Sequence, residues 1–113
     1  MKLYAKQSKS LKGWGYWGDY GEIDLGFSSG YVDRPEDFQP DMLHYHQKGT
    51  VFILVMSGSG TIEVNGQILA LKTDELLRID PGEKYRHLDV TETPFSWITV
   101  CTCKEIDDKV AVK

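Results

Sequence analysis

The sequence has little of what several protein classes require. Only two of its 113 residues are cysteine, and a single residue separates Cys101 from Cys103, so the chain is not a disulfide-stapled scaffold. The longest unbroken apolar run, 51–56, is far too short to span a membrane. Acidic residues outnumber basic ones by 17 to 13, and the net charge of −4 argues against nucleic acid and anionic membranes as partners. The N-terminus lacks the apolar stretch of a secretory signal, so we expect a cytoplasmic protein.

Short apolar segments separated by turn residues recur about every ten positions. Residues 28–41 contain Gly30, Pro35 and Pro40 and are expected to form a long surface connection. Turns are expected at 57–60, at Asn65-Gly66 and at 80–82. No window shows convincing helical periodicity, so the fold class is all-β, with about eight to ten short strands. Extended segments are expected at 20–27, 42–46, 51–56, 61–64, 67–71, 76–79, 85–90 and 97–102.

Two of the three histidines, His44 and His46, are spaced two residues apart in one of these extended segments. Side chains two apart in a strand project from the same face, so both imidazoles are expected to enter one cavity. A pair of neutral imidazoles supplies half of a tetrahedral metal shell. The same spacing also suits two hydrogen-bonded polar residues that line a pocket without metal.

The arrangement around this pair resembles a known family. His44-Tyr45-His46, the apolar run 51–56, the turn 57–60 and the Asn-Gly hairpin resemble the first motif of the cupins, and 76–87 resembles the second. The resemblance implies a single cupin-type jelly-roll β-barrel over residues 1–113. Its motif-bearing core would cover about 42–103, and 1–41 would add N-terminal strands and an aromatic segment. A looser similarity, carried by 12–16, 98–100 and 105–108, is to the cupin domain of mannose-6-phosphate isomerases.

Cupins often hold a divalent metal with three histidines and a glutamate, and this chain departs from that set. The glutamate position carries Thr50 or Val51, and the third histidine is replaced by Tyr85, with His87 two residues further on. The resemblance therefore implies a metal site of His44, His46 and His87 for Zn, Mn, Fe or Ni, or a histidine pair without metal. No organic cofactor is implied.

A second similarity, to the nucleotide-sugar ketoisomerases, implies acid–base catalysis. In that family a histidine pair persists without the metal glutamate, so His44 or His46 would act as general base and Tyr85 as proton donor. The implied function is an isomerase or epimerase that acts on a small carbonyl or sugar-like molecule. The alternative is a non-catalytic binding or sensor protein that keeps the cavity with a degenerate metal site.

Other residues are candidates for ligand contact. Aromatic rings with polar edges suit stacking on ring-bearing ligands, although the 14–20 segment could equally plug the barrel end or form a dimer contact. Arg78 interrupts an apolar strand and points either inward or into solvent. Cys101 and Cys103 suit apolar filling or, less simply, metal or redox chemistry beside the histidines. Glu22 and Glu63 are the carboxylates to examine if the cavity lacks one, and a homodimer is expected. The candidate substrate-binding residues are Trp14, Trp17, Arg78 and Trp97.

Overall fold

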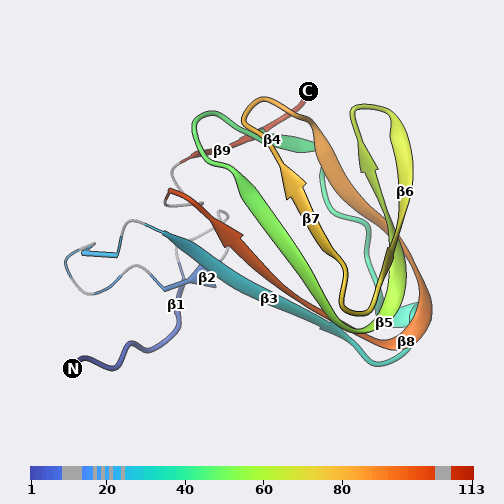
Figure 1. Cartoon of the computed structure of the whole chain (residues 1–113), viewed down its shortest axis with the longest axis horizontal. Helices are drawn as coiled ribbons and strands as arrows, with labels where there is room; N and C mark the ends of the chain where they lie inside the picture. Colours follow the sequence, from blue (N-terminus) through green and yellow to red (C-terminus); the bar gives the residue numbers. More distant parts are fainter. Residues whose placement is uncertain (9–13, 17, 19, 21, 24, 104–107) are drawn as a thin grey trace.

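The computed structural model of the 113-residue chain describes all residues except 9–13, 17, 19, 21, 24 and 104–107. The described part is built of strands with one short 3₁₀ turn, η2 (Pro35–Asp37), which confirms the all-β prediction (Figure 1). None of the helical structure described here is long or apolar enough to cross a membrane. The strands are β1 (Gln7–Ser8), β2 (Trp14–Gly15), β3 (Gly26–Val32), β4 (His44–His46), β5 (Val51–Val64), β6 (Gln67–Lys72), β7 (Leu76–Ile79), β8 (Tyr85–Cys101) and β9 (Lys109–Ala111).

Two long, bent strands organise the barrel. The first half of β5 pairs with β7 and with the second half of β8, while its second half pairs with β6 and with the first half of β8. Each long strand therefore belongs to both walls of the barrel and closes it at the corner. The edges are completed by β3 on β8, and by β4, which pairs with both β8 and β9. β1 and β2 form a separate two-stranded ribbon.

The predicted turn at 57–60 is wrong, because β5 runs through it. The register with β8 shifts on either side of Ser57 and Ser59, which is the irregularity that bends a strand at a barrel corner. Gly58 has a φ of +69°, and a Cβ there would lie 2.4 Å from the carbonyl oxygens of Glu92 and Pro94. Only glycine permits this close approach of β5 to β8. For the same reason the segments predicted at 85–90 and 97–102 are one strand, β8.

The N-terminal third also differs from the sequence prediction. The strand expected at 20–27 lies instead at Gly26–Val32, inside what was expected to be a surface connection. β3 pairs with β8 from Gly26↔Cys101 to Val32↔Phe95. Gly30 faces Trp97, whose ring lies 2.1 Å from where a Cβ would be, so the glycine makes room for that ring rather than breaking the strand. The other predicted segments and the turns at Asn65-Gly66 and 80–82 are confirmed.

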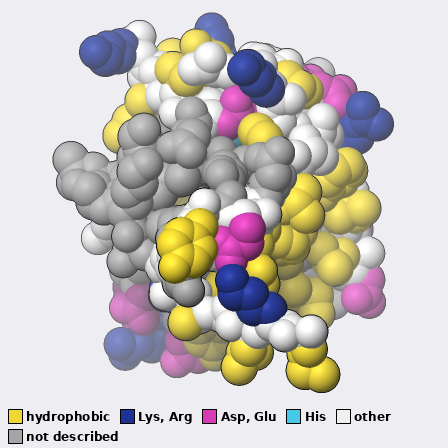
Figure 2. All heavy atoms as spheres, turned by 90° about the vertical axis from the view of Figure 1, so that its left-hand side faces the viewer, with side chains coloured by type: hydrophobic (Ala, Val, Ile, Leu, Met, Phe, Trp, Pro, Cys, Tyr) yellow, Lys and Arg dark blue, Asp and Glu magenta, His cyan; other side chains and the backbone are white. Residues whose placement is uncertain are grey.

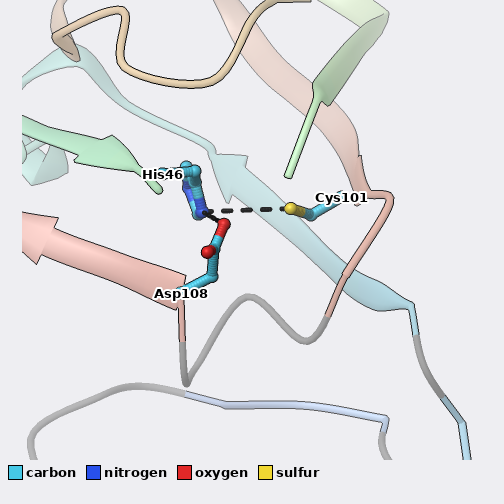
Figure 3. A group of neighbouring side chains, drawn as sticks. All are labelled: His46, Cys101 and Asp108. Atoms are coloured by element: carbon cyan, nitrogen blue, oxygen red, sulfur yellow. Dashed lines mark hydrogen bonds and ion pairs between the residues drawn. The ribbon is translucent and has the colours of Figure 1, made fainter. Parts of the chain in front are cut away.

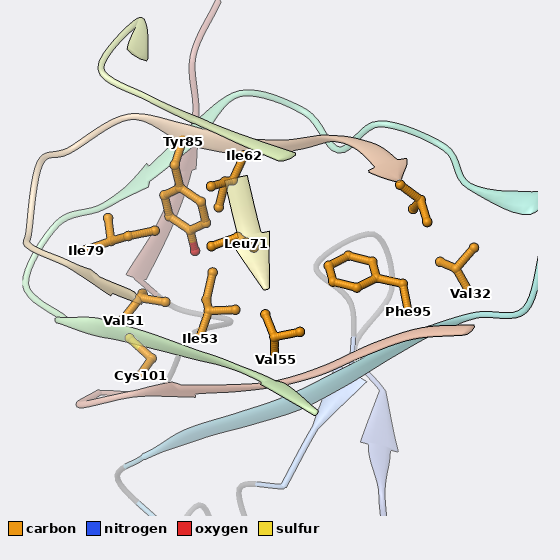
Figure 4. Close-up of a cluster of buried hydrophobic side chains, with 11 residues drawn as sticks. Val32, Val51, Ile53, Val55, Ile62, Leu71, Ile79, Tyr85, Phe95 and Cys101 are labelled. Atoms are coloured by element: carbon orange, nitrogen blue, oxygen red, sulfur yellow. The ribbon is translucent and has the colours of Figure 1, made fainter. Parts of the chain in front are cut away.

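The barrel interior is packed with apolar side chains from both walls (Figure 4). Alternate residues of β5 point inward, and Val51, Ile53 and Val55 are at most 1% exposed. Phe95 from β8 is fully buried beside them. The buried cluster comprises Val32, Val51, Ile53, Val55, Ile62, Leu71, Ile79, Tyr85, Val90, Phe95 and Cys101.

The outer face of β5, β7 and β8 is also apolar. Leu54 pairs with Ile98 on one side and with Leu76 on the other, and both of these partners are exposed. Met56 and Tyr31 are exposed as well. Hydrophobic side chains gather along one side of the molecule in the space-filling view (Figure 2).

Candidate functional site

Polar and aromatic side chains occupy the inward faces of β4 and of both halves of β8. His44 and His46 lie on the same face of β4 and are 2% and 1% exposed, as their spacing predicts. His44 pairs with Tyr85 across the two strands, which brings the first and second motifs together. Two residues along β8 from Tyr85, His87 is also buried, and Cys101 lies at the far end of the strand. The opposing inward face, on β5, is entirely aliphatic at Val51, Ile53 and Val55.

His46 is the centre of a buried hydrogen-bonded chain. Its Nε2 lies 3.0 Å from the Tyr85 hydroxyl, and its Nδ1 lies 3.5 Å from Oδ2 of Asp108. A carboxylate beside Nδ1 favours the tautomer with the proton on that nitrogen, which leaves Nε2 to accept the Tyr85 hydroxyl proton. The sequence Asp108, His46, Tyr85 is thus a carboxylate–imidazole–hydroxyl relay.

Asp108 reaches His46 because β9 adds to the edge of β4. The register is His46↔Lys109, so the residue before Lys109 lies at the level of the residue after His46, and the Gln47 N–H donates to the Asp108 carbonyl at 3.1 Å. The carboxylate accepts hydrogen bonds from the N–H groups of Lys48 at 2.9 Å and Gly49 at 2.8 Å. These two donors hold the carboxylate in one orientation.

His44 is held by a different partner. Its Nδ1–H donates to the carbonyl of Met42 at 2.7 Å, which leaves Nε2 as the unprotonated nitrogen. Asp41 Oδ2 lies 3.7 Å from the same Nδ1. The His44 ring packs on Tyr85 with centroids 4.2 Å apart, so the tyrosine ring is wedged against both histidines.

His87 carries the one orphaned polar atom of the interior that the described residues contain. Its ring stacks on Trp97 with centroids 4.6 Å apart, and Nδ1 is buried without a hydrogen-bond partner. An unmet hydrogen bond at a buried nitrogen costs on the order of 1–3 kcal/mol, so this atom is a point where a bound molecule gains affinity. The structure therefore joins two predicted residues, His87 and Trp97, in one contact.

Burial keeps all three imidazoles neutral. Desolvation lowers the pKa of His46 and of His87 to about 4, and it also lowers the pKa of His44. Burial alone would raise the pKa of Asp108, but hydrogen bonds from Gly49, the Cys103 thiol and Lys48 outweigh it and lower that pKa. Near neutral pH the relay thus consists of a carboxylate, a neutral imidazole and a phenol.

The remaining predicted residues lie elsewhere or outside the described residues. Arg78 is exposed on β7 and its guanidinium binds Asp80 at 2.8 Å, so it points into solvent. Trp14 lies in β2, and Trp17 is outside the described residues. Glu22 is exposed and pairs with Lys2, while Glu63 pairs with Arg86 at 2.7 Å.

The carboxylate of the site, Asp108, is the residue that sequence reasoning missed. It ends the short acidic stretch that follows Cys103, but nothing in its local pattern distinguishes it from solvated surface charge. The pairing of β9 with β4 brings it to His46 across 62 positions, and only a long-range contact of that kind reveals it.

Comparison with known proteins agrees with this architecture. Residues 35–101 match the family described as the cupin domain. The chain belongs to the cupin family. No curated protein matches this cupin closely enough to be reported.

Solved structures share the fold at low sequence identity. A cupin protein from Bacteroides fragilis superposes with a TM-score of 0.66 and 20% identity over 91% of this cupin and 86% of that chain. An uncharacterised double-stranded β-helix protein from Klebsiella pneumoniae gives a TM-score of 0.66 and 19% identity over 80% and 76%. The nucleoside dehydratase Pac13, whose variants were solved as Streptomyces proteins with uridine, gives a TM-score of 0.62 and 14% identity over 80% and 69%. At these identities the likeness establishes the fold alone.

The ligand set that the family resemblance implies does not fit this cupin. At the glutamate position, Val51 is fully buried in the apolar core and the Thr50 N–H is occupied by the Thr102 hydroxyl. The side chains of the three histidines do not form a cluster of possible metal ligands, whereas His46, Cys101 and Asp108 do, with ligand atoms within 4.8 Å of one another. No catalytic step is therefore derived through a metal at His44, His46 and His87.

Proposed function

We propose that this cupin is an isomerase- or epimerase-type enzyme that acts on a small carbonyl or sugar-like molecule, with Tyr85 as its proton-transferring residue. The observation that carries the proposal is the buried contact of 3.0 Å between the Tyr85 hydroxyl and Nε2 of His46, with a carboxylate beside the other ring nitrogen. A hydroxyl, an imidazole and an orienting carboxylate in sequence are the components of general acid–base catalysis.

The chemistry follows from the relay. An isomerisation or epimerisation next to a carbonyl removes a proton from carbon and returns it to another atom or to the other face. The Tyr85 proton passes to the neutral His46 Nε2, and the phenolate takes the substrate proton as the electron pair of the C–H bond moves toward the carbonyl. Asp108 stabilises the imidazolium that forms, and reversal of the transfer returns the proton.

Two further features support this class of ligand. The orphaned Nδ1 of His87, backed by the Trp97 ring, offers one hydrogen-bonding position beside an aromatic surface, which suits the polar and apolar faces of a sugar. The structural neighbour Pac13 is named as a nucleoside dehydratase, so a barrel of this shape can house a sugar-bearing molecule.

Deuterium exchange tests the proposal without knowledge of the product. The protein is incubated in D₂O with a panel of aldoses, ketoses, sugar phosphates and keto-sugar nucleotides, and mass spectrometry detects deuterium at the carbon beside the carbonyl. Tyr85→Phe keeps the ring that packs on His44 and removes only the hydroxyl, so exchange should fall by a factor of about 10² to 10⁴. Tyr45→Phe is the matched control, because Tyr45 lies between the two histidines on the opposite face of β4. Exchange that survives in Tyr85→Phe would contradict the assignment.

The second candidate function is a non-catalytic binding module, and the incomplete family ligand set favours it. A binding module would take up sugars or nucleosides with no deuterium exchange. His87→Phe, which fills the same space and removes the orphaned nitrogen, would then weaken binding.

A further inference from the structure

A second group of reactive side chains lies on the side of His46 opposite Tyr85. Nδ1 of His46 is 3.8 Å from the Cys101 sulfur and 3.5 Å from Asp108 Oδ2 (Figure 3). The Cys101 sulfur is 4.0 Å from the Cys103 sulfur, and the Cys103 thiol donates a hydrogen bond to Asp108. One imidazole nitrogen, two sulfurs and one carboxylate oxygen therefore meet around a single point.

These separations match the edges of a small tetrahedron. Zinc binds sulfur at about 2.3 Å and nitrogen or oxygen at about 2.0 Å. At tetrahedral angles, those bond lengths place two sulfurs about 3.8 Å apart, nitrogen and sulfur about 3.5 Å apart, and nitrogen and oxygen about 3.3 Å apart. The corresponding distances in the protein, 4.0, 3.8 and 3.5 Å, are each larger by only a few tenths of an ångström.

The backbone beside the cluster is shaped to leave room for it. A Cβ on Gly49 would lie 2.4 Å from the Cys101 sulfur, 2.7 Å from the Cys103 sulfur and 3.0 Å from Asp108 Oδ2. Gly49 is buried, and φ at this position is outside the left-handed region, so space rather than backbone conformation requires the glycine. The N–H groups of Gly49 and Lys48 fix the carboxylate, as outer-shell donors do in metal sites.

We propose that His46, Cys101, Cys103 and Asp108 form a closed tetrahedral site for a thiophilic divalent ion of the Zn²⁺ class. Two sulfurs and an imidazole select zinc or cobalt over magnesium and calcium, which prefer oxygen ligands. Four protein ligands leave no open position, so the ion is structural. It joins the end of β8 and the start of β9 to β4, whose His46 would keep Nε2–H and donate to Tyr85.

This site differs from the one that the family resemblance implies. It uses neither His44 nor His87, and it binds the His46 nitrogen that faces away from Tyr85. It also does not depend on the proposed enzymatic function, because a binding module would be stabilised by the same ion.

Cobalt binding tests the site directly. The reduced apoprotein is titrated with Co²⁺, and the visible d–d bands of tetrahedral cobalt and the thiolate-to-cobalt charge-transfer band in the near ultraviolet are recorded. We expect one ion per chain with both signatures, displaced by Zn²⁺, and a higher Tm with Zn²⁺. Cys103→Ser is the principal variant, since Cys103 is only half-buried; it should weaken binding by more than the roughly 10- to 100-fold that loss of an outer-shell partner costs.

The matched control is His87→Gln, a buried histidine outside the cluster. It should leave the cobalt spectrum unchanged, whereas a site of the family type would lose its ion. Titration of the wild-type zinc protein with a mercurial reagent needs no variant and should release one zinc as two thiols react. Absence of a thiolate charge-transfer band, or binding that survives Cys103→Ser and is lost in His87→Gln, would overturn the proposal.

Discussion

Substitution of Gly49 by alanine is the sharpest test of how closely the side chains around His46 are packed. The added methyl group would lie 2.4 Å from the sulfur of Cys101, which is fully buried, and 2.7 Å from that of Cys103. Cys101 cannot move aside without displacing Val51, its partner across β5 and β8. Overpacking of this kind costs about 1–3 kcal/mol in the free energy of unfolding. Because no left-handed φ is involved, the whole cost is steric.

The measurement is urea unfolding of the reduced, metal-free protein, followed by tryptophan fluorescence and circular dichroism. The midpoint should fall while the slope m stays constant, since the surface exposed on unfolding is unchanged. The Tm should fall by roughly 4 °C for each kcal/mol. In the zinc protein the loss should be larger, because the methyl group also displaces ligand atoms.

A double-mutant cycle identifies the cause. Cys101→Ala alone leaves a small cavity and is destabilising. In the double variant the Gly49→Ala methyl group occupies the space that the sulfur vacates, so the combined cost should be smaller than the sum by at least about 0.5 kcal/mol. If the two costs simply add, or if Gly49→Ala is neutral, the sulfurs do not pack on Gly49 as described.

Two further predictions concern pH and association. The pKa of His87 is lowered from 6.5 to about 4, so between these values the unfolded chain binds a proton that the folded chain excludes; stability is full above pH 6.5 and should fall by about 3 kcal/mol as the pH approaches 4. His87→Phe should flatten this fall in denaturant titrations at several pH values, and an unchanged slope would contradict it. We also propose that the outer apolar face around Ile98 and Leu76 joins two copies of the chain. Ile98→Asp should give a monomer in sedimentation velocity, and a wild type that stays monomeric at all concentrations would contradict the proposal.

The sequence alone determined much of the fold because strands and tight turns have local signatures. Alternation placed β4, β6 and β7, and Asn65-Gly66 indicated a hairpin whose two residues do adopt positive φ. Local patterns failed where a strand bends, since the glycines at 57–60 indicate a turn whether the chain reverses or only passes a barrel corner. They failed again at β3, whose serines and glycine suit a strand only because Trp97 covers Gly30.

The site was divided in the same way. The histidine pair and Tyr85 could be found from the sequence because spacing along a strand fixes which side chains share a face. The carboxylate and the sulfurs could not, because residues 46, 101 and 108 meet only through the pairing of β4 with β9 and the return of β8 beside β5. Asp108 looks like surface charge and Cys101 like apolar filling until the strand register places both at His46. Local chemistry fixed the elements, and the long-range contacts of the tertiary structure decided which nitrogen of His46 faces which partner.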